Sequence, residues 1–376
     1  MGNNSAATLD YAVEYPSGER EVHGAEPPKF TISVDDRAQL QQVLTGEDYT
    51  AALGFIHGDF DISGDLVAAL RLRQGLSHTS WRGRLLNLAA RLSPTRLETW
   101  FQGRARAARN IRFHYDLPTA FYDIFLDSRH VYSAADFRDA RWTLEQAQES
   151  KLQHICEDLE LRSGERFLDV GCGWGGLVTY AAENYGVRAT GCTLSHNQFQ
   201  FGQKLVDTRG LGHAVSIREM DYRDLNGRFD KIASVGMFEH VGRHRMMAYF
   251  RKICSLLESG GMFFNSGIVR PRNVGDDAQT WFVLKRVFPG GELVHLADVI
   301  KVAESAGLEI LRVKTLRTDY ARTCREWVDR LRQRESDCIR LVGEETYRTW
   351  LLYLAGSAAN FGDNTTSAFS VLMRKP

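Results

Sequence analysis

Long apolar segments are missing from the sequence. No run of about 18 uncharged apolar residues occurs, so no membrane-spanning helix is predicted. The N-terminus, MGNNSAATLDYAVEYPSGERE, has neither a basic start nor an apolar stretch, which argues against a secretory leader. We therefore expect a cytoplasmic protein.

Cysteine is also sparse. The six cysteines are widely separated and never form a CxxC pair, so neither a disulfide framework nor a zinc or other metal site is predicted. We expect reduced thiols at all six positions, which are Cys156, Cys172, Cys192, Cys254, Cys324 and Cys338.

The overall composition is that of a globular protein. Apolar residues make up 43% and charged residues 25%, which excludes the fibrous and disordered classes. A length of 376 residues predicts more than one domain, because a domain usually takes about 100–200 residues. We place a small N-terminal domain in residues 1–75, a basic helical linker in 76–112 and a larger domain in 113–376.

The net charge of zero hides a strong asymmetry near the N-terminus. Residues 1–70 contain twelve acidic and three basic residues, whereas residues 71–112 contain ten arginines and one acid, Glu98. Apolar residues recur at near-helical spacing from Leu66 to Arg112, which predicts a basic amphipathic helix. Its arginines could pair with the acidic N-terminal domain or attract anionic lipid headgroups, at about 1 kcal/mol per basic residue. No basic motif interleaved with aromatic residues is present, so we expect no nucleic-acid partner.

From about residue 145 the pattern alternates between helix and strand. Alternation of this kind predicts a mostly parallel sheet covered on both faces. The expected strands are RFLDV, VRATGCT, AVSIREM, KIASVG, GMFFNSGIV and the C-terminal SAFSVLMRKP. The expected helices are WGGLVTYAAENYG, SHNQFQFGQKLVDTRG with Ser195 as N-cap, and RHRMMAYFRKICSLLESGG.

A glycine-rich turn follows the first of these strands in RFLDVGCGWGG. Glycine permits a sharp strand-to-helix turn and a close approach of backbone to ligand, so the turn predicts the floor of a nucleotide-type pocket. GxGxxG alone is a weak signal shared with dinucleotide dehydrogenases. Those enzymes need an acid about 20 residues onward to hold a ribose hydroxyl, and none stands in ATGCTLSHNQ. Asp169, two residues before the first glycine, is instead typical of S-adenosylmethionine methyltransferases.

A series of further stretches occurs in a characteristic order: FHYDLPTAFYDIFLD, VYSAADF, EQAQESKL, LDVGCGWGG, TLSHNQ, MDYRDLNGRFDKIASVGMFEHVG and RVFPGGEL. In order and approximate spacing they resemble the cyclopropane fatty acid synthase family over roughly residues 105–376, with a fainter likeness in LGFIHGDFDISGDL. The resemblance implies an α/β fold with a seven-stranded, Rossmann-like class I methyltransferase sheet and a helical cover over an acyl pocket. It also implies a small N-terminal α+β domain of a lipid-handling type.

The same resemblance implies that the glycine turn and its neighbours bind S-adenosylmethionine. Backbone N–H groups at a helix N-terminus and nearby hydroxyls can hold the methionine carboxylate. Thr193 and Gln198 offer neutral hydrogen bonds to the ribose. Tyr222 would flank the adenine, although a half-buried aromatic at a strand end is the structural alternative. The implied cofactor-binding residues are Tyr132, Ser133, Asp169, Gly171, Gly173, Thr193, Leu194, Gln198 and Tyr222.

An alkene acceptor makes specific demands on such a site. It is a weak nucleophile, so the sulfonium methyl must be held in line with the double bond at near-attack distance. Methyl transfer leaves a carbocation that water would quench, so the acyl pocket must be dry and apolar. A general base must then remove a proton.

The resemblance assigns that base to a bicarbonate held by a cysteine, a glutamate, a histidine and a tyrosine. The glutamate is present as Glu239, but the other three positions read Ala134, Ser266 and Val328. A buried anion without donors is costly, so bicarbonate is expected to bind weakly.

Three side chains are our candidates for catalysis: Glu239, Ser266 and His240, with Asn265 as a further alternative for the base. Glu239 could instead be a structural carboxylate, and His240 a core or surface residue. Loss of a proton other than the one that closes a ring would give a methylene- or methyl-branched chain.

Three classes of function remain open. The first is methyl(ene) transfer from S-adenosylmethionine to the double bond of an unsaturated acyl chain in a phospholipid, giving a cyclopropane or a branched product. The second is C-methylation of a soluble natural-product intermediate, and the third is an inert lipid-binding protein. For the first we expect unsaturated phospholipid acyl chains and an anionic membrane surface as partners, at the inner face of the membrane. A homodimer is an open alternative to a monomer.

Overall fold

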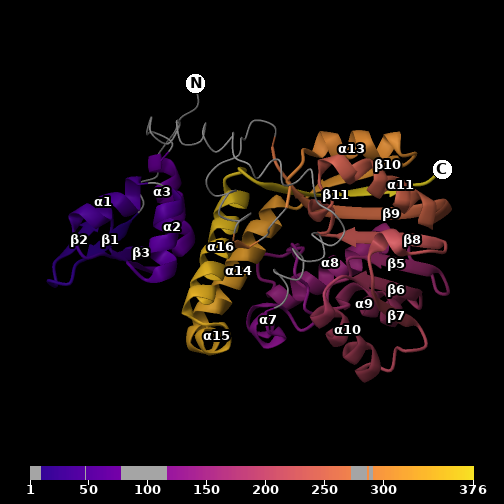
Figure 1. Cartoon of the computed structure of the whole chain (residues 1–376), viewed down its shortest axis with the longest axis horizontal. Coiled ribbons are helices and arrows are strands. Elements are labelled where there is room, and N and C mark those ends of the chain that lie inside the picture. Colours follow the sequence, from indigo (N-terminus) through magenta and orange to yellow (C-terminus); the bar gives the residue numbers. More distant parts are fainter. Residues whose placement is uncertain (1–9, 47, 78–116, 272–285, 288–290) are drawn as a thin grey trace.

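The computed structural model describes residues 10–46, 48–77, 117–271, 286–287 and 291–376. Within these ranges the strands form a four-stranded and a seven-stranded sheet (Figure 1). The larger sheet and its covering helices confirm the predicted class I methyltransferase architecture, and the smaller sheet confirms the N-terminal α+β domain. The linker predicted at 76–112 lies almost entirely outside the described residues, so the three domain boundaries stay predictions.

The N-terminal domain packs helices on a short sheet of order β2-β1-β3-β4. β1 pairs antiparallel with β2 and parallel with β3, and β4 closes the sheet antiparallel to β3. Val13, Phe30 and Ile32 fill its core. Its elements are β1 (Tyr11–Glu14), β2 (Arg20–His23), β3 (Phe30–Ser33), α1 (Arg37–Thr45), α2 (Asp48–His57), β4 (Asp61–Gly64) and α3 (Leu66–Ser77).

The larger sheet has the order β10-β11-β9-β8-β5-β6-β7. Its strands are β5 (Arg166–Val170), β6 (Arg188–Thr193), β7 (Val215–Glu219), β8 (Phe229–Val235), β9 (Leu257–Val269), β10 (Glu309–Thr315) and β11 (Ser367–Arg374). The neighbours from β7 to β9 are parallel, whereas β11 is antiparallel to both β9 and β10. The sheet grows outward in both directions from β5, so its switch point lies between β5 and β8, where open α/β sheets bind ligands.

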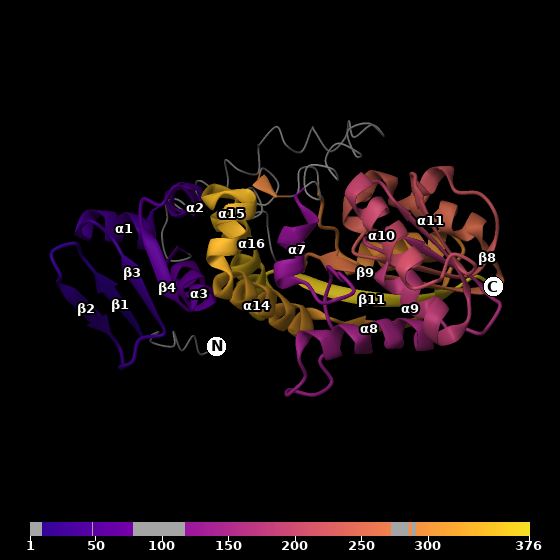
Figure 2. The same ribbon diagram turned by 90° about the horizontal axis from the view of Figure 1, so that it is seen from below.

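Helices cover both faces of this sheet (Figures 1 and 2). On one face, Phe167 of β5 packs with α8, α9 and α10, and on the other, Leu168 packs with α11 and α13. Successive residues of a strand point to opposite faces, so RFLDV must be apolar on both. The helices are α8 (Leu144–Asp158), α9 (Gly176–Tyr185), α10 (His196–Thr208), α11 (Met246–Leu256) and α13 (Leu296–Ser305).

Local signals place most of these boundaries. α9 ends at Gly186, whose φ of 65° is the left-handed conformation of a helix C-cap. Ser195 caps α10 by accepting a hydrogen bond from the Gln198 N–H, as predicted. The helix expected from RHRMMAYFRKICSLLESGG is shorter than predicted: α11 ends at Leu256, and the following residues begin β9. At these residues pairing with β8 overrides helix propensity, because the backbone N–H and C=O groups of β9 form hydrogen bonds with those of β8.

A helical cover lies between the sheet and the N-terminal domain (Figure 2). It consists of α7 (Thr119–Phe125), α14 (Arg317–Gln333), α15 (Glu335–Val342) and α16 (Glu344–Gly362). Its core is aromatic: Phe121 and Phe125 lie edge-on or tilted against Trp350, and Phe125 lies edge-on to Trp327. This matches the predicted helical cover.

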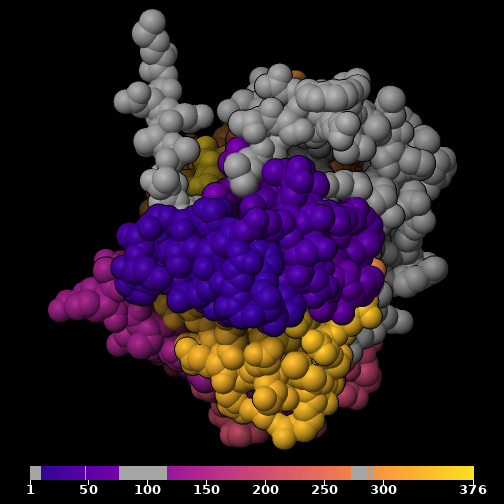
Figure 3. Space-filling model, turned by 90° about the vertical axis from the view of Figure 1, so that its left-hand side faces the viewer, coloured from indigo at the N-terminus to yellow at the C-terminus, as the bar shows by residue number. Residues whose placement is uncertain are grey.

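The N-terminal domain lies over the helical cover (Figure 3), and arginines of the cover contact its acidic residues. Arg325 of α14 contacts the Asp65 carboxylate at 3.0 Å, and Arg348 of α16 contacts Asp61 at 3.3 Å and the Phe55 carbonyl at 3.1 Å. Within the predicted basic segment, Arg73 pairs with Asp48 at 3.1 Å. Two of the N-terminal acids, Asp61 and Asp65, therefore have partners in the helical cover, a pairing that the sequence did not predict.

All six cysteines are free thiols. Among the described residues, no helix combines the length and the apolar character that crossing a bilayer would require.

Candidate active site

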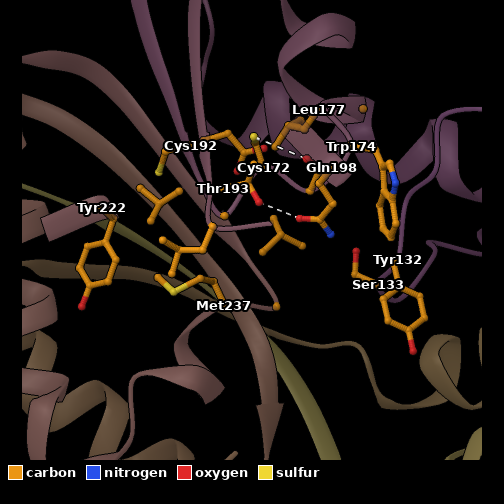
Figure 4. Close-up of a pocket in the computed structure, with 18 of the residues that line it drawn as sticks. Tyr132, Ser133, Cys172, Trp174, Leu177, Cys192, Thr193, Gln198, Tyr222 and Met237 are labelled. Atoms are coloured by element: carbon orange, nitrogen blue, oxygen red, sulfur yellow. Dashed lines mark hydrogen bonds between the residues drawn. The ribbon is translucent and has the colours of Figure 1, made fainter. Parts of the chain in front are cut away.

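A cavity of about 160 Å³ lies at the carboxyl ends of β5, β6 and β8. All nine residues predicted to bind the cofactor line it, although they come from four separate segments of the chain (Figure 4). They are Tyr132, Ser133, Asp169, Gly171, Gly173, Thr193, Leu194, Gln198 and Tyr222.

The glycine turn forms one wall of this cavity. Gly171 and Gly173 have φ values of 81° and 54°, a region that side chains rarely adopt. A Cβ on Gly171 would lie 2.9 Å from Cγ of Met237, whereas a Cβ on Gly173 would meet no protein atom within 4 Å. Gly173 therefore borders open space, as expected for backbone that approaches a ligand.

Asp169 and Lys151 place a carboxylate and an ammonium in the same lining. Asp169 is 3% exposed, and among the described residues its Oδ1 has no hydrogen-bond partner. The Lys151 ammonium donates to Ser133 Oγ at 2.7 Å. Burial raises the pKa of Asp169 and lowers that of Lys151, and the attraction between the two charges opposes both shifts. Lys151 was not among the residues predicted to bind the cofactor, although it lies in the motif EQAQESKL.

Thr193 and Gln198 form a hydrogen-bonded pair at the end of β6. Thr193 Oγ1 donates to Gln198 Oε1 at 2.7 Å. With its oxygen engaged, Gln198 keeps its amide nitrogen as a donor, and Figure 4 shows the side chain turned toward the cavity. A neutral donor in this position suits a hydroxyl group of a ligand.

Tyrosines stand at opposite ends of the cavity in Figure 4. Tyr222, on η1 (Tyr222–Asp224), is half-buried and packs edge-on against Tyr249 with ring centroids 5.6 Å apart. Tyr132 packs against Trp327 of the helical cover at 5.1 Å. The groups between these ends include a carboxylate, an ammonium and neutral donors, and this set fits a zwitterionic nucleoside such as S-adenosylmethionine.

A second cavity of about 40 Å³, here called the reaction chamber, adjoins the first. Both are lined by Ser133, Lys151, Ile155, Val235 and Gly236. The reaction chamber also contains Glu239 and Ser266, two of the three predicted catalytic residues. Ser266 lies in β9 opposite Ser370 of β11, which in turn lies opposite Lys314 of β10, and all three line the chamber.

Glu239 lies on η2 (Phe238–His240), immediately after β8, and is 8% exposed. Its Oε1 accepts a hydrogen bond from the Ile268 N–H at 2.6 Å, whereas Oε2 is buried without a hydrogen-bond partner among the described residues. Burial raises the pKa of Glu239 to about 7, against the opposing effect of the Ile268 hydrogen bond. A carboxylate with this pKa can both accept and release a proton near neutrality.

His240 and Asn265 lie elsewhere. His240 lines the larger cavity and not the reaction chamber, and burial lowers its pKa to about 4, so it is neutral at pH 7. Asn265 precedes Ser266 in β9 and therefore points to the other face of the sheet, where its Oδ1 accepts from the Tyr249 hydroxyl at 3.0 Å. This orientation sets Asn265 aside as a base.

The structure corrects the expectation drawn from Val328. That residue is buried in the core of the helical cover and does not line the reaction chamber. The tyrosine that does line it is Tyr320, eight residues earlier in α14. Eight residues span about 12 Å of helix, so a side chain at Val328 cannot reach the place in the chamber wall that Tyr320 occupies. The chamber therefore has a tyrosine, while Ala134 and Ser266 stand where the resemblance implies cysteine and histidine.

Comparisons with known proteins bear on the family to which this chain belongs. The family model described as mycolic acid cyclopropane synthetase matches residues 102–371. A protein named "Probable fatty acid methyltransferase" from Pseudomonas putida is 38% identical over 93% of this chain and 88% of its own. Cyclopropane mycolic acid synthase 3 of Mycobacterium tuberculosis is 32% identical over 71% of this chain and 96% of its own.

Among solved structures, the mycolic acid cyclopropane synthase CmaA1 complexed with SAH and CTAB has a TM-score of 0.69 and 31% identity. The similarity covers 71% of this chain and 98% of that one. On these grounds the chain belongs to the mycolic acid cyclopropane synthetase family.

Proposed function

We propose that this protein transfers a methyl group from S-adenosylmethionine to the double bond of an unsaturated fatty acyl chain in a phospholipid, and that Glu239 takes up the proton released. The observation that carries the proposal is the buried, unpartnered Oε2 of Glu239 in a chamber that adjoins the larger cavity. Membership of the family makes the protein an S-adenosylmethionine-dependent methyltransferase.

The chain's own residues would hold the donor in the larger cavity. Asp169 can pair with an ammonium group and Lys151 with a carboxylate, because each is buried and each lies in the lining. Gln198 and Tyr222 offer a hydrogen-bond donor and an aromatic face for the nucleoside. When bound, S-adenosylmethionine supplies an electrophilic methyl group.

The reaction chamber would hold the reacting carbons of the acyl chain beside that cavity. Ala134, Phe264 and Leu316 give it apolar walls, which keep the cationic carbon formed on the acyl chain away from bulk water. Glu239 stabilises that positive charge while it is ionised. Its carboxylate then accepts the proton lost from the acceptor.

Glu239 is a better candidate for this proton than a bound bicarbonate. Ala134 has no polar side-chain atom, and Ser266 is shorter than the histidine that the resemblance implies. With two of the four anchors replaced, an anion in the chamber would lack the donors that offset its burial. The Glu239 carboxylate is held in place by the Ile268 N–H and needs no further anchor.

The product is decided by which proton Glu239 reaches. Removal of a proton from the new methyl group with ring closure gives a cyclopropane. A methylene branch forms when a hydride first shifts to the cationic carbon, which moves the charge to the methylated carbon, and the methyl group then loses the proton. Loss of a chain proton leaves a methyl branch. The branched products are the second candidate. The replacements at Ala134 and Ser266 favour them, because the base is then the Glu239 side chain on η2 and not a bicarbonate positioned by four side chains.

The proposed substrate makes the protein peripheral to the inner face of the membrane. An N-terminal domain and a predicted basic segment beside it would be superfluous for a soluble acceptor. Lipid substrates also appear in the names of relatives, such as the sphingolipid C9-methyltransferase of Candida albicans, 32% identical over 74% of this chain.

The test uses the purified protein with methyl-labelled S-adenosylmethionine and vesicles of an anionic, monounsaturated phospholipid. We expect S-adenosylhomocysteine and a phospholipid that gains one labelled carbon, with saturated vesicles as the matched control. Chromatography and fragmentation of the released fatty acid separate ring, methylene and methyl products. Equal turnover on saturated vesicles, or methylation only of soluble acceptors, would refute the proposal.

A further inference from the structure

The wall of the reaction chamber contains a compact charged cluster, here called the Asp136 cluster. Asp136 is 6% exposed, and its Oδ2 lies 2.5 Å from Nδ1 of His154. The same oxygen accepts from Arg138 Nε at 3.1 Å, and Oδ1 lies 3.3 Å from the Lys314 ammonium. Asp136, His154 and Lys314 all line the chamber that contains Glu239.

The cluster also reaches the surface. The side chains of His154 and Lys314 are 29% and 39% exposed, whereas that of Asp136 is 9% exposed. His154 follows Lys151 by three residues on α8, so both project from the same face of the helix into the chamber. Because Nδ1 is engaged by Asp136, Nε2 is the ring nitrogen left for proton exchange.

Turnover creates a need for such a group. Each reaction leaves one proton on Glu239, and the carboxylate must lose it before the next acyl chain reacts. The mouth of the larger cavity is a poor exit, because it would be occupied by the donor and open the cationic carbon to water. The chamber itself offers a polar side, lined by Ser266, Ser370 and Lys314 on adjacent strands.

We propose that His154, held by Asp136, relays the proton from Glu239 to solvent. The inference rests on the proposed function. In the relay, Glu239 returns to carboxylate as its proton passes through the hydroxyl-lined side of the chamber to His154 Nε2. The imidazolium so formed is stabilised by the Asp136 carboxylate and then releases the proton at the surface. His154 is the relay residue, and Asp136 is a positioning residue.

The charges around the cluster keep Asp136 ionised for this task. Burial raises the pKa of its carboxyl group, but the hydrogen bond from His154 and the charges of Lys314 and Arg138 outweigh burial, so the pKa is lowered. The other charged groups that face the cluster are Lys151 and Asp158 on α8, Arg312 on β10, which pairs with Asp158, and Asp319 and Arg322 on α14.

The decisive experiment compares His154→Ala with wild type in the vesicle assay, following both the first turnover and the steady state. At a pH of about 8.5, above the pKa of Glu239, we expect the first turnover to be preserved, because Glu239 starts as a carboxylate. The steady-state rate should fall by about 10- to 100-fold, within the range of a positioned proton-transfer group. Added imidazole should restore the steady state. His213→Ala, at an exposed histidine remote from the chamber, is the matched control.

Asp136→Asn provides a second test that keeps the size of the side chain. We expect a similar loss in the steady state that imidazole does not restore, because His154 still occupies its site. Calorimetric affinity for S-adenosylmethionine should be unchanged in all variants, which shows that the fold and the larger cavity are intact.

The outcomes separate the relay from the proposed function. If wild type turns over and His154→Ala reaches the same steady-state rate, the relay is overturned and the proposed function is not. A loss in His154→Ala that affects the first turnover equally and resists imidazole would also overturn it, since that pattern belongs to a structural ion pair. No turnover by wild type on unsaturated vesicles would overturn the proposed function and the relay with it.

Discussion

Replacing Glu239 by glutamine tests the chemistry most directly. In the wild type, Oε1 of Glu239 accepts a hydrogen bond from the Ile268 N–H at 2.6 Å. Glutamine has nearly the same size and keeps an oxygen for this bond, but it cannot accept the proton. Proton transfer by a positioned side chain typically contributes about 10²- to 10⁴-fold, so we expect turnover to fall by that factor. This loss corresponds to about 3–5 kcal/mol of transition-state free energy.

The pH dependence gives a second readout of the same group. The pKa of Glu239 is about 7 in the folded protein, above its ordinary value, so wild-type turnover should rise as pH increases through 7 and the carboxylate forms. Stability has the opposite sign: because the folded state holds the proton more tightly, wild type loses stability as pH rises from about 4.5 to 7, by on the order of 3 kcal/mol. Glu239→Gln should lack this loss.

The assay is release of S-adenosylhomocysteine on unsaturated phospholipid vesicles between about pH 5.5 and 9, with cofactor affinity and denaturant unfolding measured in parallel. Glu258→Gln serves as the control, because Glu258 pairs with Arg166 at the surface, away from both cavities. Undiminished turnover in Glu239→Gln, with the wild-type pH profile, would remove Glu239 from the mechanism.

Further predictions concern the cofactor cavity, a helix cap and the missing anchors. Gly173→Val should abolish S-adenosylmethionine binding in calorimetry, whereas Gly210→Val, at a φ of 66° with equally open surroundings but far from the cavity, should only lower stability; equal affinity in the two variants would contradict the cavity assignment. Thr143→Ala removes the capping box of α8 and should lower the free energy of unfolding by about 1 kcal/mol in urea titration, with turnover retained. Combining Ala134→Cys with Ser266→His should make turnover depend on added bicarbonate in CO₂-free buffer, and a rate indifferent to bicarbonate would count against the anchor argument.

Much of the larger domain could be predicted because its signals are local. The strand RFLDV is buried on both faces, and its apolar residues identify β5. The glycines after it have positive φ, and their spacing identifies the turn that forms one wall of the larger cavity. Ser195 caps α10 through a bond only three residues long. The nine residues expected to bind the cofactor came from the family resemblance of the motifs that contain them, and the structure places all nine around one cavity.

The errors arose where distant segments meet. The predicted α11 was too long because pairing between β8 and β9 is invisible to a helical pattern. The tyrosine of the reaction chamber was sought at Val328 and is Tyr320, because only the packing of α14 on the sheet decides which face of that helix points inward. Lys151 and His154 were overlooked for a similar reason: on α8 they read as ordinary polar residues until the loop carrying Ser133 and Asp136 is folded against them.

The sequence by itself determined the class of fold and the glycine turn, because short-range periodicity and turn geometry encode them. The groups expected around the donor rest on the resemblance of its motifs to a known family. The tertiary structure alone decided that Glu239 is buried with one oxygen unpartnered, that its pKa is raised, and that it shares a chamber with His154 and Asp136. Burial and the field of neighbouring charges depend on segments more than 80 residues apart in the chain, so no local pattern can specify them.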